Sequence, residues 1–147
     1  IGYHYGAGNK DELKNLFKKS LRIILVMSIV LTVAAEALAR PLSMIFVSYD
    51  QELLEMTTYA FAVYSVSFLI SGYNIYALSF FTALNDGFTS ALISFCRTLI
   101  FEVIAVLVLP VLFGAYGIWY AVITAEVFAL MLSVFFLARN RKKYGYI

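Results

Sequence analysis

The chain has 147 residues, of which 63% are hydrophobic and 14% are charged, with a formal net charge of +2 and a mean hydropathy of +0.87. Soluble domains have about half apolar and about a quarter charged residues, so this composition excludes a soluble globular protein. We therefore expect an integral membrane protein whose main partner is the lipid bilayer, with no nucleic-acid partner.

Residues 1–20 form a basic segment before the first long apolar run. Leu13, Leu16, Phe17 and Leu21 recur at helical spacing, with most of the lysines on the other side. Because the segment is fused directly to a membrane span, the pattern predicts a short helix that lies in the membrane interface. A solvated run of charges is the alternative.

Four apolar segments follow, and each is long enough to cross a bilayer. A spanning helix needs roughly 20 residues, because each residue rises about 1.5 Å through a hydrocarbon layer of about 30 Å. Alternation in runs of about ten residues, as in barrel strands, does not occur. The connections are short, so consecutive helices are expected to be antiparallel neighbours in an all-α membrane protein. The predicted spans are residues 21–47, 57–84, 90–113 and 116–138.

The distribution of charge predicts the orientation. Nine of the 11 Lys and Arg residues lie at or before the start of the first span or after the last one, so the positive-inside rule places both ends in the cytoplasm. An even number of spans agrees with this topology, and residues 139–147 become a cytoplasmic basic tail. The loop after the first span contains Asp50, Glu52 and Glu55 but no base. We expect a bacterial or archaeal plasma membrane.

Two carboxyl groups are predicted near the middle of the membrane. Glu102 lies near the centre of the third span and Glu126 near the centre of the fourth, so the two share one depth. An ionisable group at that depth costs a few kcal/mol on insertion scales. We therefore expect at least one of them to line a hydrated cavity and to bind a proton or a cationic solute.

The second span carries a polar stripe at the same level. Ser67, Ser71 and Asn74 recur at i, i+4 and i+7, which places them on one face of a helix. We assign this stripe to the substrate or ion pathway together with Glu102 and Glu126. The alternative is that these side chains hydrogen-bond neighbouring helices.

Three further charges within the spans favour structural roles. Arg97 lies nearer the cytoplasmic end of its helix, where a long side chain reaches the interface. Glu36 is followed one turn later by Arg40, and this spacing predicts a structural pair near the outer face.

The sequence gives little support for an enzyme. It has no nucleophile and base pair, no metal-ligand cluster and no phosphate-binding loop, so neither a cofactor nor a metal is expected. Cys96 is the single cysteine and is expected to pack inside its helix, and His4 has no neighbouring ligands for a metal site.

Several segments resemble one family of transporters. The segment IGYHYGAGNKDELKNLFKKSLR, Ile1 to Arg22, is similar to the helix end and basic connection midway through the second half of multidrug and toxic compound extrusion (MATE) transporters. SGYNIYALSFFTALNDG, Ser71 to Gly87, the helix with Arg97 and Pro110, and GAYGIWYAVITAE resemble the last three helices of that family. The order of these pieces matches along nearly the whole chain.

The resemblance implies a fold and an activity. Members have twelve helices in two six-helix lobes and export cationic drugs in exchange for protons or sodium by alternating access. Residues 1–147 would then be the end of helix 8 and helices 9 to 12 of the C-terminal lobe, which agrees with a chain that opens at Ile1 without an initiator Met. The remaining partners would be small organic cations and the N-terminal lobe of the same polypeptide.

One departure bears on the coupling ion. Sodium-coupled members carry a carboxylate in the middle of the helix that corresponds to residues 57–84, whereas this chain has Ser71, Gly72 and Asn74 there. The coupling ion is H⁺ or Na⁺, with H⁺ favoured.

Two other functions remain open at this stage. A lipid-linked saccharide flippase of the same superfamily would need a basic cavity for an anionic pyrophosphate, and only Arg40 and Arg97 are available within the spans. A four-helix membrane scaffold or accessory subunit without a transport path would instead have Glu102 and Glu126 paired across helices and closed to solvent.

Overall fold

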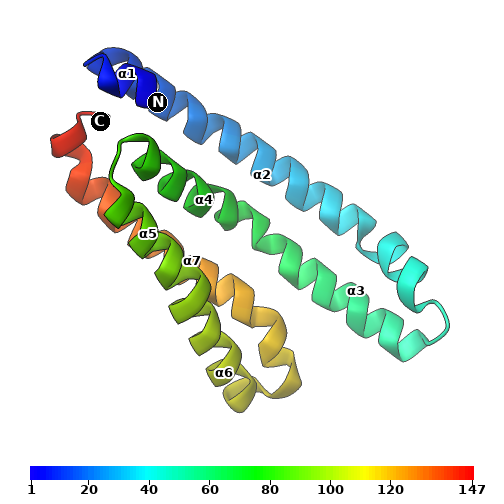
Figure 1. Ribbon diagram of the computed structural model, residues 1–147. Coiled ribbons are helices and arrows are strands. Elements are labelled where there is room, and N and C mark those ends of the chain that lie inside the picture. The colour runs from blue at the N-terminus through cyan, green and yellow to red at the C-terminus, as the bar shows by residue number, and fades with distance from the viewer.

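The computed structural model describes residues 1–147, and every regular element in it is a helix. The helices form antiparallel legs, and both chain ends lie at the same end of the molecule (Figure 1). The prediction of an all-α membrane protein is confirmed. The elements are α1 (Gly2–Gly6), α2 (Lys10–Val47), α3 (Gln51–Val66), α4 (Phe68–Ala83), α5 (Gly87–Phe95), the π-helix η1 (Cys96–Phe101), α6 (Glu102–Phe113), the 3₁₀ turn η2 (Gly114–Tyr116) and α7 (Gly117–Tyr144).

The four legs form two helical hairpins. The first hairpin pairs α2 with α3 and α4, which together make one bent leg with an angle of 42° at Ser67. The second hairpin pairs α5, η1 and α6 with α7. Helix α2 is long and apolar enough to span a membrane, and so is the stretch from Gly87 to Tyr144. The bent leg qualifies as a third span. Because the stretch from Gly87 to Tyr144 reverses at η2 (Figure 1), it supplies two crossings.

The basic segment at the start of the chain differs from the expectation. Residues 10–20 are the first turns of α2 and not a separate interfacial helix. Asn9 caps this helix, since its side chain accepts a hydrogen bond from the backbone N–H of Glu12 at 3.1 Å. The apolar side chains Leu13 and Phe17 are buried inside the protein. Their helical periodicity therefore reflects packing against the rest of the chain.

An aromatic core joins both hairpins at the end where the termini lie. Phe17 of α2 packs with its ring centroid 5.0 Å from Phe80 of α4 and 5.1 Å from Tyr146 of the C-terminal tail. Tyr146 also donates a hydrogen bond to the Leu137 carbonyl at 2.6 Å. This core holds α2, α4 and α7 together.

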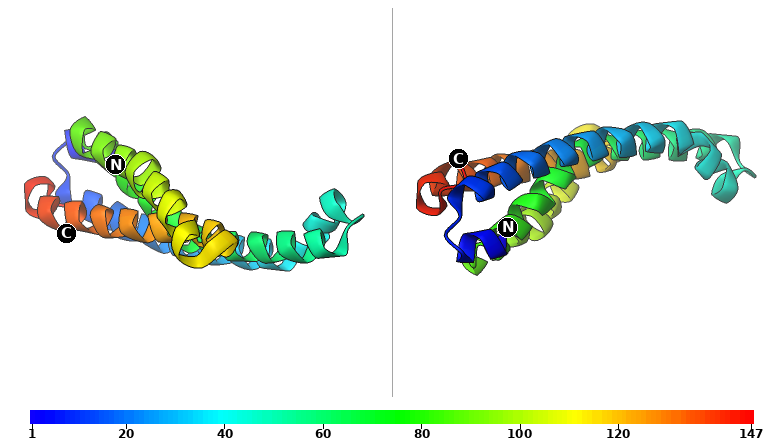
Figure 2. Two further views of the ribbon diagram at one scale, coloured as in Figure 1. Left: turned by 90° about the horizontal axis from the view of Figure 1, so that it is seen from below. Right: turned by 90° about the horizontal axis from the view of Figure 1, so that it is seen from above.

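The turn between α4 and α5 is fastened to the end of α7. Asp86 caps α5 by accepting from the Thr89 N–H at 3.2 Å, and it accepts from the Tyr144 hydroxyl at 2.6 Å. Burial disfavours the charge on Asp86, but these hydrogen bonds and nearby Lys143 outweigh burial and hold the pKa of this carboxyl below its ordinary value. Figure 2 shows α1 beside the same turn, where Gly2 approaches the Ala83 carbonyl.

The second hairpin is closely packed near its turn. Gly114 ends α6 with φ +67° and ψ −157°, a conformation that glycine adopts without strain. Small residues at Ala105, Ala121 and Ala125 let α6 and α7 approach closely. At Gly117 a Cβ atom would lie 2.3 Å from the Leu109 carbonyl oxygen. Only glycine fits there.

The close approach at Gly117 gives a stability prediction. We expect Gly117→Ala to lower the free energy of unfolding by about 1–3 kcal/mol, because the added methyl group forces the backbones apart. Gly87→Ala is the matched control, since a Cβ there meets nothing within 4 Å. Unfolding in detergent measures both variants, and equal stability of the two would contradict this packing.

Candidate functional site

A network of polar side chains lies at the junction of α4, η1 and α7. Its centre is Glu126 in the middle of α7, whose side chain is only 8% exposed. Arg97 of η1 donates from Nε to both carboxylate oxygens at 3.1 Å and from Nη2 to Oε1 at 2.5 Å. Asn74 of α4 donates from Nδ2 to Glu126 Oε2 at 2.7 Å and to the Glu126 carbonyl at 3.0 Å. Ser133, two turns further along α7, donates to Asn74 Oδ1 at 3.1 Å.

Arg97 lies in a π-helix. An extra residue in a helical turn shifts the following side chains by about 100° around the axis, one residue's rotation in an α-helix. Such π turns are rare and occur frequently at functional sites. Here Arg97 lies at the start of the wider turn and bonds to Glu126 of α7, while Glu102, the first residue of α6, follows the turn and is exposed.

The network is electrically neutral and closed. The positive charge of Arg97 balances the negative charge of Glu126, and the amide of Asn74 bonds on one side to Glu126 and on the other to Ser133. A buried pair of this kind is costly to desolvate, and removal of one partner costs about 3–5 kcal/mol because the other charge is then left alone. At bilayer depth no water replaces a lost partner. The arrangement therefore fixes α4, η1 and α7 relative to one another.

The structure brings together only some of the predicted pathway residues. Asn74 and Glu126 are in direct contact, whereas Glu102 forms no side-chain hydrogen bond or ion pair and does not meet Glu126. Ser67 is buried at the bend between α3 and α4, and Ser71 lies half-buried one turn further along. The stripe on α4 thus reaches the network through Asn74 alone.

The three charges that favoured structural roles lie differently from the expectation. Arg97 belongs to the buried network and does not extend to the interface. Glu36 and Arg40 do not form an ion pair, because the chain has only the pairs Arg97–Glu126 and Lys143–Asp86. Glu36 instead contacts Ser65 of α3 at 2.8 Å.

Sequence reasoning missed several residues of this region. Ser133 lies seven residues after Glu126, and that spacing on one face of a helix could have identified it. Tyr59 and Tyr120 hydrogen-bond through their hydroxyl groups and connect α3 to α7, with Tyr116 packed edge-on against Tyr59. No short-range signal links residues so far apart. No three His, Cys, Asp or Glu side chains come together as a set of metal ligands.

Comparison with known proteins gives one match. The model of the MatE family matches residues 1–108, which is more than half of the chain and extends from α1 into α6. No curated protein matches the chain. No solved structure matches it either.

A double-mutant cycle tests the ion pair. We expect Arg97→Met and Glu126→Met each to lower the free energy of unfolding by about 3–5 kcal/mol, since each leaves a buried charge without a partner. The double variant leaves no lone charge, so it should be at least as stable as either single variant. Unfolding in detergent gives the four values of the cycle, and additive losses would show that the two charges do not interact.

Proposed function

Because this chain belongs to the MatE family of membrane efflux transporters, we propose that it forms part of a transporter that exports small organic cations by alternating access. H⁺ or Na⁺ is the coupling ion in this proposal, with H⁺ favoured. Residues 1–147 correspond to the end of helix 8 and helices 9 to 12 of the C-terminal lobe, and the other lobe completes the pathway. Both chain ends face the cytoplasm.

The observation that carries the proposal is an excess of unpaired carboxylates within the spans. Arg97 neutralises Glu126, but Glu36 and Glu102 are exposed and belong to no ion pair. An ionised carboxylate facing lipid costs several kcal/mol, so these two groups favour surfaces that face water or further protein. Arg40 is the one base deep within the spans that has no ion-pair partner. When both carboxylates are ionised, they outnumber Arg40 and such surfaces attract cations.

The same charges argue against the two alternatives. A flippase for a lipid-linked saccharide needs free basic groups for a pyrophosphate, and the pairing of Arg97 leaves Arg40 as the only candidate deep in the spans. A closed scaffold calls for Glu102 and Glu126 to be paired, whereas Glu102 is exposed. An exporter of organic cations therefore has the best support.

Within the proposal, Glu126, Asn74, Ser71 and Ser67 lie on the pathway and Glu102 on its wall. The neutral pair of Glu126 and Arg97 is a closed state of the network, because neither charge is available to a ligand. Access to Glu126 requires the Arg97 side chain to move away. That side chain is 19% exposed, so it is not fully enclosed by the protein. Alternating access supplies such a rearrangement.

Dye efflux tests the proposal. In the full-length transporter reconstituted in liposomes with a proton gradient, we expect Glu102→Gln to slow export of a cationic dye several-fold, because a negative charge is lost from the pathway. Glu52→Gln, at the exposed start of α3, is the matched control and should export at the wild-type rate.

The double variant Glu102→Gln with Glu126→Gln gives the opposing outcome. If it is present in the membrane at the wild-type level and exports the dye as fast as wild type, neither carboxylate takes part in transport.

A further inference from the structure

A second polar cluster lies between α2 and α3, away from the Glu126 network. Its members are Glu36 and Thr32 on α2 and Ser65 on α3, two residues before the bend at Ser67. Ser65 is fully buried, whereas Glu36 is exposed. Thr32 donates to the Ser28 carbonyl at 2.8 Å. Thr32 also lies 3.5 Å from the Ser65 carbonyl oxygen, and the other two contacts of the cluster involve the Ser65 hydroxyl.

The contacts of Ser65 determine where the protons are. Its Oγ lies 2.8 Å from Glu36 Oε1 and 2.7 Å from the Ala62 carbonyl oxygen. A carbonyl oxygen only accepts, and a serine hydroxyl has one proton to donate. If Glu36 were ionised, one proton would have to serve two acceptors at full hydrogen-bond distance. Both contacts are satisfied when Glu36 is protonated and donates to Ser65, which in turn donates to Ala62.

From this geometry we propose that Glu36 is a proton-binding site of the transporter, with Ser65 as its hydrogen-bond partner. The structure represents the loaded form, in which the neutral acid avoids the cost of a charge at bilayer depth. The inference rests on the proposed function only for the use of the proton, which would be the coupling ion for export. The site is separate from Glu126, whose carboxylate is held by Arg97.

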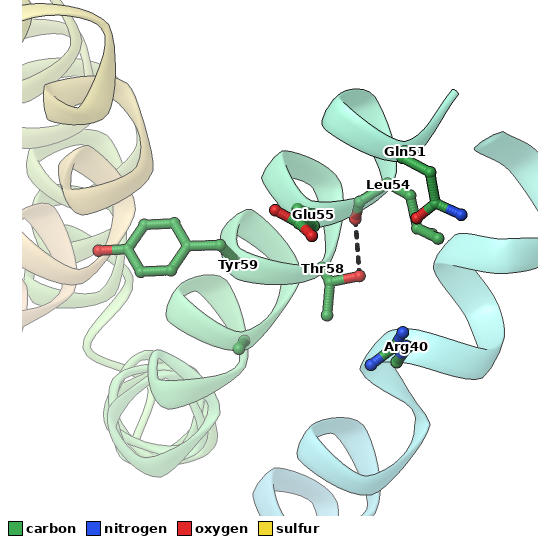
Figure 3. A pocket seen from close by; sticks show the side chains of 7 residues that line it. Arg40, Gln51, Leu54, Glu55, Thr58 and Tyr59 are labelled. Carbon is green, nitrogen blue, oxygen red and sulfur yellow. Dashed lines mark hydrogen bonds between the residues drawn. The ribbon is translucent and has the colours of Figure 1, made fainter. Parts of the chain in front are cut away.

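A cavity lies beside the Ser65–Ala62 hydrogen bond. It has a volume of about 290 Å³ between α2 and α3, and Ala62, the acceptor of the Ser65 bond, is part of its wall. This volume is large enough for several water molecules. Figure 3 shows polar side chains from both helices around it, with Thr58 bonded to the Leu54 carbonyl. Other polar groups on the wall are Arg40, Gln51, Glu55 and Tyr59.

The charged groups around the site do not hold the Glu36 carboxylate. On its own helix Arg40 lies one turn further along, and on α3 the nearest acid on the cavity wall is Glu55. Neither forms an ion pair or a hydrogen bond with Glu36. Tyr59 is engaged with Tyr120 of α7, and α4 contributes no charged residue. Glu36 is exposed, so a proton can leave it without breaking a salt bridge.

Loss of that proton changes the turn before the bend. Once Glu36 is ionised, the Ser65 hydroxyl donates to the carboxylate, and the Ala62 carbonyl loses its side-chain donor. The backbone here is already tightened, since the Ser67 N–H bonds to the Tyr64 carbonyl at 2.9 Å in place of the usual i−4 partner. The protonation state of Glu36 thus changes the hydrogen bonds next to the point where α3 and α4 bend by 42°. The proton moves to water, and no further reactant is needed.

Infrared difference spectroscopy on the purified full-length transporter tests the site directly. A protonated carboxylic acid has a C=O stretching band that an ionised carboxylate lacks. We expect such a band in the wild-type protein at neutral pH, its loss in Glu36→Gln and its retention in the control Glu52→Gln. Glu36→Gln keeps the shape of the acid and can donate to Ser65, so it is expected to fold. A band of equal size in wild type and Glu36→Gln would overturn the proposal.

Ser65→Ala provides a second readout that a merely structural role would not change. Without its acceptor the Glu36 acid loses a hydrogen bond, so its band should shift to higher frequency, and an unshifted band would contradict the pairing. Proton-driven dye efflux should fall at least tenfold in Glu36→Gln and stay at the wild-type rate in Glu52→Gln. If wild type exports no organic cation while the band belongs to Glu36, the proposed function fails and the proton site stands. If wild type exports the dye and the band does not belong to Glu36, the proton site fails and the proposed function stands.

Discussion

The structure depends on one constraint, which is that polar groups at bilayer depth must find their partners inside the protein. Glu126 satisfies it with Arg97 and Asn74, and each of these three residues comes from a different helical element. Asn74 is the only member from the first hairpin, so its two hydrogen bonds to Glu126 connect the hairpins at the centre of the membrane. The aromatic core around Phe17 holds the terminal end, the Tyr59–Tyr120 hydrogen bond joins α3 to α7 beyond the network, and the far ends of the hairpins diverge (Figure 1).

The three carboxylates within the spans meet the same constraint in different ways. Glu126 is paired with a base, Glu36 is hydrogen-bonded to a serine, and Glu102 is exposed without a partner. The first arrangement is neutral because two charges cancel, and the second is neutral in the proposed form because the acid carries a proton. The third is compatible only with a hydrated or protein-covered surface. In the proposed transporter these three groups are a structural joint, a proton site and a surface that attracts cations.

The sequence predicted the spans because hydropathy depends on composition along the chain and not on which residues meet. Short connections such as Asn85 to Gly87 predicted that consecutive helices are antiparallel and that the two termini lie at the same end. Contacts between helices were not accessible in the same way. Glu36 and Arg40 are neighbours on one helix, yet the carboxyl group bonds to Ser65 on another. The π turn at Cys96–Phe101, which contains Arg97, has no signature in hydropathy.

The angle between the hairpins tests the central role of the Asn74 link most directly. Spin labels at Tyr49→Cys in the α2–α3 turn and Ala115→Cys in η2, with Cys96→Ser, report the distance between the two diverging ends by double electron–electron resonance. With Asn74 present, the account predicts a narrow distribution of distances. Asn74→Ala leaves the Arg97–Glu126 pair in place but removes the connection from α4, and the distribution should become broader and longer. An unchanged distribution in Asn74→Ala would show that the network does not hold the hairpins together.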